Sequence, residues 1–195
     1  MGMIILPYQL KKQIREIKEN YFIPSLNGLK GNVLEIGYGT GDNLQFYNYN
    51  ECTVYAIDKS DKSSTLKQTV NQKKGKLLLQ KGNAEKLHFQ NEFFDTVISS
   101  FVLCSVDSVS KAIQEITRVL KSNGKLILLE HIKSDNKYII LTQEVLTKIQ
   151  NYFSIDCHFN RDPRKFIKND TFDITKEKIF PNALEPYLYL EAIKR

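Results

Sequence analysis

The sequence predicts an α/β fold in which a doubly wound, mostly parallel sheet of seven strands carries helices on both faces. Short apolar strand patterns alternate with amphipathic helix patterns along the chain, an order typical of parallel sheets. A glycine-rich turn at 37–41 follows the first strand pattern. The last two strand patterns have no helix-length segment between them, so we expect an antiparallel last strand.

The N-terminal third begins with a helix pattern followed by two strand patterns. Apolar residues recur at helical spacing at Leu10, Ile14, Ile17 and Tyr21. We expect Pro24 and the Asn27–Gly28 pair to end this helix. Apolar runs predict buried strands at 33–36 and 52–57, and Asp42 is expected to start a helix between them.

The middle of the chain continues the alternation of strands and helices. Apolar runs at 77–79 and 95–98 predict the third and fourth strands. The clearest helix pattern follows, at Val109, Ala112, Ile113, Ile116, Val119 and Leu120. Asp107 is expected to cap its start and Asn123–Gly124 to end it, before a fifth strand at 125–130.

The C-terminal third is expected to hold two helices and two strands. A helix is predicted over 138–152, and Asp162–Pro163 supplies an N-cap and a first-turn proline for a short helix near Phe166. The last strands are expected at 171–175 and 187–193. The whole chain is expected to form a single domain, divided into an N-terminal helix (1–30), a core (31–132), covering helices (133–170) and terminal strands (171–195).

The composition favours a globular domain in a reducing compartment. The chain has 195 residues, 42% of them hydrophobic, and no apolar run long enough to span a membrane. The segment Met1–Pro7 is too short for a signal peptide. Cys52, Cys104 and Cys157 lie far apart, which argues against a disulfide framework and a zinc site. A net charge of +6 allows an anionic partner, but lysines spread along the whole chain favour a solvated surface.

The glycine turn limits the kind of ligand. Gly37, Gly39 and Gly41 stand at alternate positions, where they allow a ligand to approach the backbone. A dinucleotide site would need a third glycine where Asp42 or Leu44 stands, which disfavours an oxidoreductase. An acid at position 42 would also repel a pyrophosphate. The spacing therefore favours a ligand without phosphate.

Two carboxylates near this turn indicate what that ligand carries. Glu35 lies in the strand before the turn, where a buried carboxylate needs a partner such as an ammonium group. Asp58 ends the second strand and can accept hydrogen bonds from both hydroxyls of a ribose. A ligand with a ribose, a cationic amino-acid portion and no phosphate is S-adenosylmethionine.

Five segments in order resemble class I S-adenosylmethionine-dependent methyltransferases. They are motif I at 35–41, the second-strand acid Asp58, a GDAExLPF-like segment at 82–89, an FDxVxSS-like strand at 94–100 and an RVLKPGGxL-like segment at 118–126. The chain departs from the family pattern at Asn83, which replaces an aspartate, at His88, which replaces a proline, and at Tyr38, where a small residue is common. The resemblance implies a Rossmann-like fold and S-adenosyl-L-methionine as cofactor.

A narrower resemblance is to the methyltransferase type 11 group. Segments 103–106, 130–132 and 157–162 are similar to its thiol methyltransferase-like members, and the chain is also similar to ubiquinone–menaquinone methyltransferase-like members. Mammalian thiol methyltransferases of this group carry an N-terminal hydrophobic anchor. The chain shows no such segment, so we expect a cytoplasmic location and no membrane span.

The resemblance assigns functions to individual residues. The expected cofactor-binding residues are Glu35, Gly37, Tyr38, Gly39, Gly41, Asn43, Asp58, Lys59, Asn83, Ala84, Ser100, Phe101 and Cys104. His131 and His158 are the candidate catalytic residues, each as a general base. No metal is expected.

The expected reaction is methyl transfer to a small, apolar acceptor bearing a thiol, oxygen or nitrogen nucleophile. The apolar residues within 133–170 are expected to cover that acceptor. Two alternatives stay open: a non-catalytic S-adenosylmethionine-binding protein and an RNA methyltransferase. No obligate nucleic acid is expected, and the protein is expected to be a monomer or a homodimer.

Overall fold

A computed structural model describes residues 8–60, 64–66, 75–134, 136–141, 143–144, 158, 160–168, 170–182 and 186–195. Seven strands form one sheet in the order β3-β2-β1-β4-β5-β7-β6. The strands are β1 (Gly31–Ile36), β2 (Cys52–Asp58), β3 (Leu77–Lys81), β4 (Phe94–Ser100), β5 (Leu120–His131), β6 (Phe172–Phe180) and β7 (Tyr187–Lys194). The helices are α1 (Tyr8–Ile17), η1 (Lys18–Phe22), α2 (Ile23–Leu26), η2 (Leu44–Phe46), α4 (Val109–Val119) and η3 (Pro163–Phe166).

The sheet has the predicted mixed character. Strands β1 to β5 pair in parallel, whereas β7 pairs antiparallel with both β5 and β6. The expected α/β class and antiparallel last strand are therefore confirmed. The strand order reverses between β1 and β4, and the crevice at the carboxyl ends of these strands is where open α/β sheets bind ligands.

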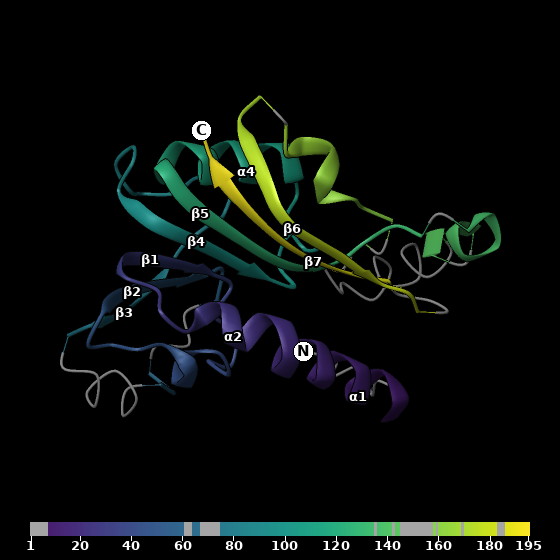
Figure 1. The fold of residues 1–195 in the computed structure, drawn as a ribbon, viewed down its shortest axis with the longest axis horizontal. Coiled ribbons are helices and arrows are strands. Elements are labelled where there is room, and N and C mark those ends of the chain that lie inside the picture. Colours follow the sequence, from purple (N-terminus) through teal and green to yellow (C-terminus); the bar gives the residue numbers. More distant parts are fainter. Residues whose placement is uncertain are drawn as a thin grey trace.

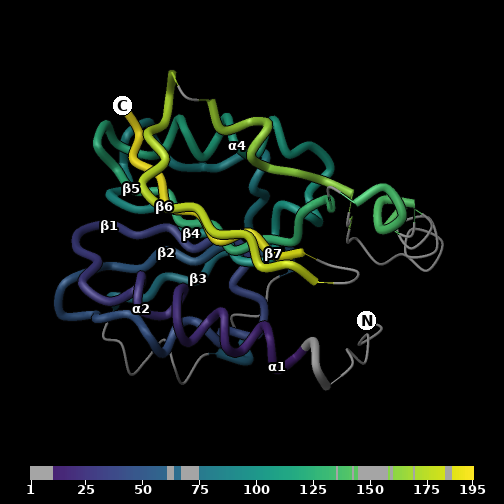
Figure 2. Tube along the Cα trace, turned by 45° about the vertical axis from the view of Figure 1, so that its right-hand side comes forward, coloured from purple at the N-terminus to yellow at the C-terminus, as the bar shows by residue number. Residues whose placement is uncertain are grey.

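Helices cover both faces of the sheet, as Figures 1 and 2 show. Helix α4 packs its apolar side on one face, with Ala112, Ile116 and Val119 fully buried. Helices α1, η1 and α2 cover the other face through Ile17, Phe22 and Leu26. No described helix has the length and apolar character needed to cross a membrane.

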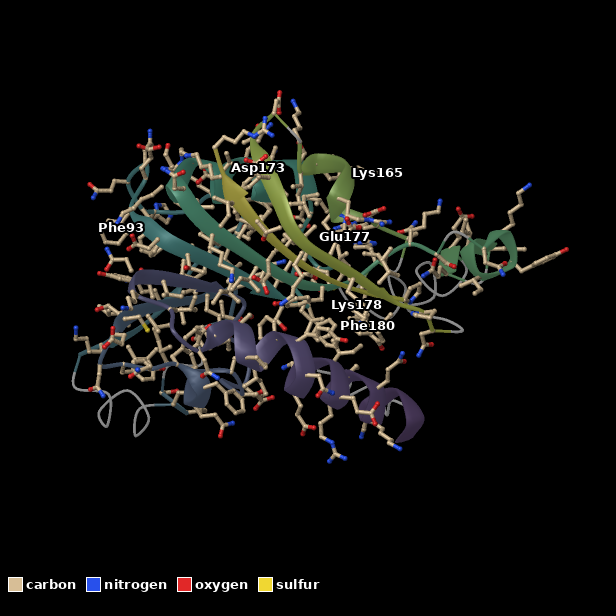
Figure 3. The ribbon with its side chains drawn as sticks, viewed as in Figure 1. Phe93, Lys165, Asp173, Glu177, Lys178 and Phe180 are labelled. Atoms are coloured by element: carbon tan, nitrogen blue, oxygen red, sulfur yellow. The ribbon has the colours of Figure 1, made fainter. Side chains whose placement is uncertain are left out.

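The N-terminal helix continues past Pro24, the first of the two expected breaks, and ends at the second, Asn27–Gly28. Pro24 occupies the first turn of α2, where its missing N–H is tolerated, and the helix ends only at Asn27. The π-helical segment η1 precedes it. This helix also reaches the far edge of the sheet, because the Tyr21 ring lies 5.0 Å from the Phe180 ring and 4.3 Å from the Lys178 ammonium. Figure 3 labels Lys178 and Phe180 on β6.

The helix expected at Asp42 is absent from the structure. Residues 40–43 form turns, and only the single 3-10 turn η2 follows. The connection from β1 to β2 has fifteen residues, 37–51. The prediction was wrong because turns and bends within 39–43 and 47–51 take up most of this connection and leave room only for η2.

Both predicted ends of α4 also need correction. Ser108, not Asp107, is the N-cap, since its side chain accepts a hydrogen bond from the Lys111 N–H. The Asp107 N–H is instead bound by the Glu85 carboxylate. At the other end the helix stops at Val119, because Leu120 is extended and pairs with Phe94. Asn123 and Gly124 consequently lie within β5 rather than at a helix end.

The C-terminal third agrees with the expected elements where it is described. Residues 137–141, 143 and 144 are helical, and the rest of the helix expected over 138–152 lies outside the described residues. Asp162 caps η3 by accepting a hydrogen bond from the Arg164 N–H. The strands expected at 171–175 and 187–193 correspond to β6 and β7, which are longer than predicted.

Candidate functional site

A cavity of about 370 Å³ lies at the carboxyl ends of β1, β2 and β4. Its volume is in the range of small-molecule sites. Four segments line it: the glycine turn, the end of β2, the loop after β3 and the turn after β4. Eight of the predicted cofactor-binding residues line it, namely Gly37, Gly39, Asp58, Lys59, Asn83, Ala84, Ser100 and Phe101.

The glycine turn lines the cavity with the backbone atoms of Gly37 and Gly39, which have no side chains. Gly37, Gly39 and Gly41 all have positive φ, at 74°, 52° and 82°. A Cβ at Gly37 would overlap the Val102 side chain, so the protein itself requires glycine there. A Cβ at Gly39 would meet no described atom within 4 Å, so this position faces open space. The two glycines therefore have different reasons for lacking a side chain.

Asp58 is fixed at the end of β2 by the turn itself. Its Oδ2 accepts a hydrogen bond from the Gly39 N–H at 2.9 Å, and its Oδ1 accepts bonds from the Ser60 N–H and hydroxyl. The Asp58 carboxylate thus already accepts the hydrogen bond from the Gly39 N–H, which a bound phosphate would need. The turn is followed by the 3-10 turn η2 and not by an α-helix whose N-terminus could attract an anion. The remaining lone pairs of Asp58 can accept from hydroxyl groups. The arrangement fits a ribose and does not suit a phosphate.

The loop after β3 forms the next wall of the cavity. Asn83 closes a local turn, in which its Oδ1 accepts a hydrogen bond from the Glu85 N–H at 2.8 Å. Ala84 is buried beside it. The Glu85 carboxylate accepts hydrogen bonds from the N–H groups of Asp107 and Ser108, at 2.6 and 3.2 Å. This loop is thereby joined to the start of α4, which fixes the shape of the wall.

Glu35 lies beside the cavity in a buried polar network. Asn43 donates to its Oε1 and the Tyr47 hydroxyl donates to its Oε2, each at 2.9 Å. The Lys18 ammonium donates to the Asn43 side chain at 3.1 Å. Burial raises the pKa of Glu35, and the two hydrogen bonds and the Lys18 charge oppose that rise. The chain therefore supplies the hydrogen-bond partners that the sequence interpretation expected from a ligand.

The turn after β4 contributes the last wall and contacts both candidate histidines. The Phe101 ring lines the cavity, and its centroid lies 4.9 Å from that of His131. The backbone N–H of His158 donates to the backbone carbonyl of Cys104 at 2.9 Å. The two histidines come from segments far apart in the sequence and meet the same short stretch, residues 101–104.

Several predicted residues lie next to the cavity without lining it. Tyr38 and Asn43 are buried in the core beneath the glycine turn. Gly41 packs against Leu66, whose side chain a Cβ would approach to 2.9 Å. Cys104 is buried. Cys157, from the segment similar to thiol methyltransferases, lies outside the described residues.

The sequence interpretation missed two charged residues near the cavity. Lys18 belongs to the Glu35 network, and nothing in its sequence context distinguished it from the other lysines. Glu130 is fully buried at the end of β5, where its Oε1 accepts hydrogen bonds from the Ser99 hydroxyl and the Val102 N–H. The signal used for Glu35, an acid in a buried strand, also marks Glu130.

Metal ligands do not gather at this site. Within the described part of the chain, no group of three or more histidines, cysteines and acids is arranged to hold a metal ion. The residues that line the cavity instead offer backbone amides, the fixed carboxylates of Asp58 and Glu85, and apolar side chains. Such a set suits an organic ligand with hydroxyl groups and an apolar portion.

Comparison with known proteins agrees with these features. A family model described as a methyltransferase domain matches residues 34–128. The thiol S-methyltransferase TMT1B of Rattus norvegicus is 32% identical over 179 residues, covering 80% of this chain and 68% of that protein. A demethylmenaquinone methyltransferase of Leptospira interrogans is 37% identical over 133 residues, covering 65% and 51%. A geranyl diphosphate methyltransferase solved in complex with SAM has the same fold, with a TM-score of 0.71 at 9% identity, covering 94% and 87%.

Proposed function

The chain belongs to the S-adenosyl-L-methionine-dependent methyltransferases, and from this premise we propose that it methylates the sulfur of a small, apolar thiol. The observation that carries the proposal is the cavity at the strand ends, whose lining includes Asp58 at the end of β2 and Phe101 after β4. The presence of thiol S-methyltransferases among its relatives is the reason to propose sulfur, and not oxygen or nitrogen, as the acceptor atom.

The cofactor follows the length of the cavity in this proposal. Asp58 accepts hydrogen bonds from the ribose hydroxyls, and Asn83 and Ala84 contact the adenine. The amino-acid portion passes over Gly37 and Gly39 towards Ser100 and Phe101. When bound, S-adenosyl-L-methionine supplies an electrophilic methyl group on a sulfonium. The protein's task is then to hold the acceptor sulfur in line with that methyl and to exclude water.

The acceptor side lies beyond Phe101, towards the two histidines. A thiol must lose its proton before its sulfur attacks, and a nearby imidazole can accept that proton. The His131 ring packs against the Phe101 ring, and the backbone N–H of His158 is held at the Cys104 carbonyl. We assign the general base to this pair. An apolar substrate follows from the expectation, made from the sequence, that apolar residues within 133–170 cover the acceptor.

The test is a comparison of matched acceptors. The purified protein is incubated with S-adenosyl-L-methionine and hexanethiol, hexanol or hexylamine, and the methylated products are measured by mass spectrometry. We expect turnover of the thiol only. Methylation of the alcohol or the amine in place of the thiol would overturn the assignment of sulfur.

The histidine variants test the proton transfer. This test uses an apolar acceptor chosen to have a thiol pKa of about 8.5, lower than that of hexanethiol. At pH 7 only a few per cent of such a thiol is ionised, so a base gains at most roughly thirty-fold. We expect His131→Ala or His158→Ala to lower kcat/KM about ten-fold at pH 7. Near pH 9.5 the loss disappears, because the thiol ionises unaided. A loss of equal size at both pH values would exclude a base function.

A further inference from the structure

Glu130 is a buried carboxyl group that lies behind the cavity wall. It is the penultimate residue of β5, its side chain has no exposed surface, and it does not line the cavity. One oxygen, Oε1, accepts hydrogen bonds from the Ser99 hydroxyl at 2.7 Å and from the Val102 N–H at 3.1 Å. In the described part of the structure, Oε2 has no hydrogen-bond partner. Burying a carboxyl group with one unpaired oxygen costs free energy, so its presence here needs an explanation.

Its hydrogen bonds hold a strained turn. Phe101 has φ +58°, in the left-handed region that side chains with a Cβ rarely adopt. Such a conformation costs about 1–3 kcal/mol and persists only where its surroundings impose it. The restraints are on both sides of the residue: the Phe101 N–H donates to the Leu129 carbonyl at 2.8 Å, and the next N–H, of Val102, donates to Glu130.

The turn at Phe101 and Val102 also packs against the glycine turn. Val102 packs so closely on Gly37 that a Cβ at Gly37 would overlap it. Phe101, Val102 and Gly37 all line the cavity. The Glu130 carboxyl is therefore linked by one hydrogen bond and one packing contact to two of the cavity's walls.

We propose that Glu130 is a positioning residue that holds the turn after β4 and so shapes the end of the cavity that receives the amino-acid portion of the cofactor. The inference rests on the proposed function, because it takes the cavity for the cofactor site. Asp58 and Asn83, at the adenosine end, have no contact with Glu130, so that end is independent of it.

The geometry distinguishes among three substitutions. Both hydrogen bonds go to one oxygen, so Glu130→Gln keeps an acceptor in place. Glu130→Leu removes it, and Glu130→Asp keeps a carboxyl group but withdraws it by one methylene. Glu191→Gln is the matched control, since Glu191 is a buried acid on β7 that pairs with Lys125 and Lys176 away from the cavity.

The experiment measures binding of two probes by calorimetry. S-adenosylhomocysteine fills both ends of the cofactor site, and adenosine fills one. We expect Glu130→Leu and Glu130→Asp to weaken S-adenosylhomocysteine about ten-fold and to leave adenosine within two-fold of wild type. Glu130→Gln should bind both normally. Glu191→Gln should lower the melting temperature with no change in either affinity.

A second measurement needs no ligand and remains informative if a Glu130 variant is unstable. Glycine adopts a left-handed φ without strain, so in the Phe101→Gly background the turn no longer depends on Glu130. The drop in melting temperature caused by Glu130→Asp should then be at least halved. An equal drop in both backgrounds would mean that Glu130 does not hold the turn.

The outcomes separate this inference from the proposed function. Normal S-adenosylhomocysteine affinity in Glu130→Leu and Glu130→Asp would overturn it, as would equal losses for both probes. A wild-type protein that binds S-adenosylhomocysteine but methylates no thiol would contradict the proposed acceptor and leave the positioning of the turn intact.

Discussion

Single residues at the glycine turn separate the needs of the fold from those of the ligand. Gly37 is required by the packing of Val102, whereas a Cβ at Gly39 would have no neighbour within 4 Å among the described residues. Because Gly39 lines the cavity, we expect a bound ligand to occupy the space next to it. Gly39 is consequently the better position for testing ligand binding without disturbing the core.

Gly39→Ala should lose affinity for S-adenosylhomocysteine at least ten-fold, because the added methyl occupies the cavity. Its free energy of unfolding should fall by only about 1 kcal/mol, the cost of a strained φ. Gly28→Ala is the matched control, since Gly28 also has positive φ and open space and lies outside the cavity. Calorimetry and urea unfolding measure both effects. Equal affinity in the two variants would mean that the cofactor does not pass over Gly39.

Glu35 gives a prediction with a definite sign in pH. Burial raises its pKa in the folded protein above the ordinary 4.5, so the folded state binds more protons than the unfolded state just above pH 4.5. The contribution of Glu35 to stability is therefore greatest at low pH and declines as pH rises through the raised pKa.

The free energy of unfolding of wild type minus that of Glu35→Gln should decrease as pH rises from 4.5, by at most about 1.4 kcal/mol per pH unit. The amide of the variant does not titrate, which isolates the carboxyl group. Urea unfolding at a series of pH values measures the difference. A difference that increases with pH would show that the network of Asn43, Tyr47 and Lys18 outweighs burial.

At the scale of elements, the sequence predicts what depends on local periodicity and misses what depends on neighbours. The apolar stripe of α4 and the strand runs were located correctly because they reflect burial. The helix at Asp42 was wrong because turns on both sides of η2 take up the connection to β2. The cap at Asp107 was wrong by one residue: the Glu85 carboxylate, from a distant loop, holds the N–H groups of both Asp107 and Ser108, and the Ser108 side chain is the one that accepts from the Lys111 N–H.

The prediction of the site residues also succeeded where it depended on local sequence and failed where it depended on distant contacts. Gly37, Gly39 and Asp58 could be placed at the cavity because they lie at strand ends, where ligands bind in such sheets, whereas Asn83 and Ala84 came from the family resemblance. Lys18 could not be assigned, since its partner Asn43 is distant in sequence. Glu130 carried the same signal as Glu35, but its contact with Val102 could not be predicted.

The start of α4 offers a direct test of the corrected cap. Ser108→Ala removes the side-chain acceptor for the Lys111 N–H and should lower the free energy of unfolding by about 1 kcal/mol. Asp107→Ala removes no capping bond and should cost less than about 0.5 kcal/mol. Urea unfolding of both variants decides between them. A larger loss for Asp107→Ala would restore the cap that the sequence suggested.

At the scale of the whole molecule, stability should follow position in the sheet. Strands β1, β2, β4, β5 and β7 are interior, whereas β3 and β6 are the edges. Residues of β7 are almost all buried, and most of those in β6 are exposed. A strand with neighbours on both sides opens only when the sheet opens.

Hydrogen exchange followed by mass spectrometry should therefore show the slowest exchange in β4, β5 and β7, and faster exchange in β3 and β6. The comparison of β6 with β7 is the most informative, because these two adjacent strands are paired to each other. If β6 were protected as strongly as β7, another molecule or segment would have to cover its outer edge.

The insertion of β7 between β5 and β6 also has a consequence during translation. The ribosome completes β5 long before β7 exists, so the outer edge of β5 stays open until β7 is made. At ordinary elongation rates the fifty-six residues from His131 to Tyr187 take about 3–11 s. Strand β6 then becomes the edge of the finished sheet, where its charged side chains, Asp173, Lys176, Glu177 and Lys178, oppose pairing with another chain.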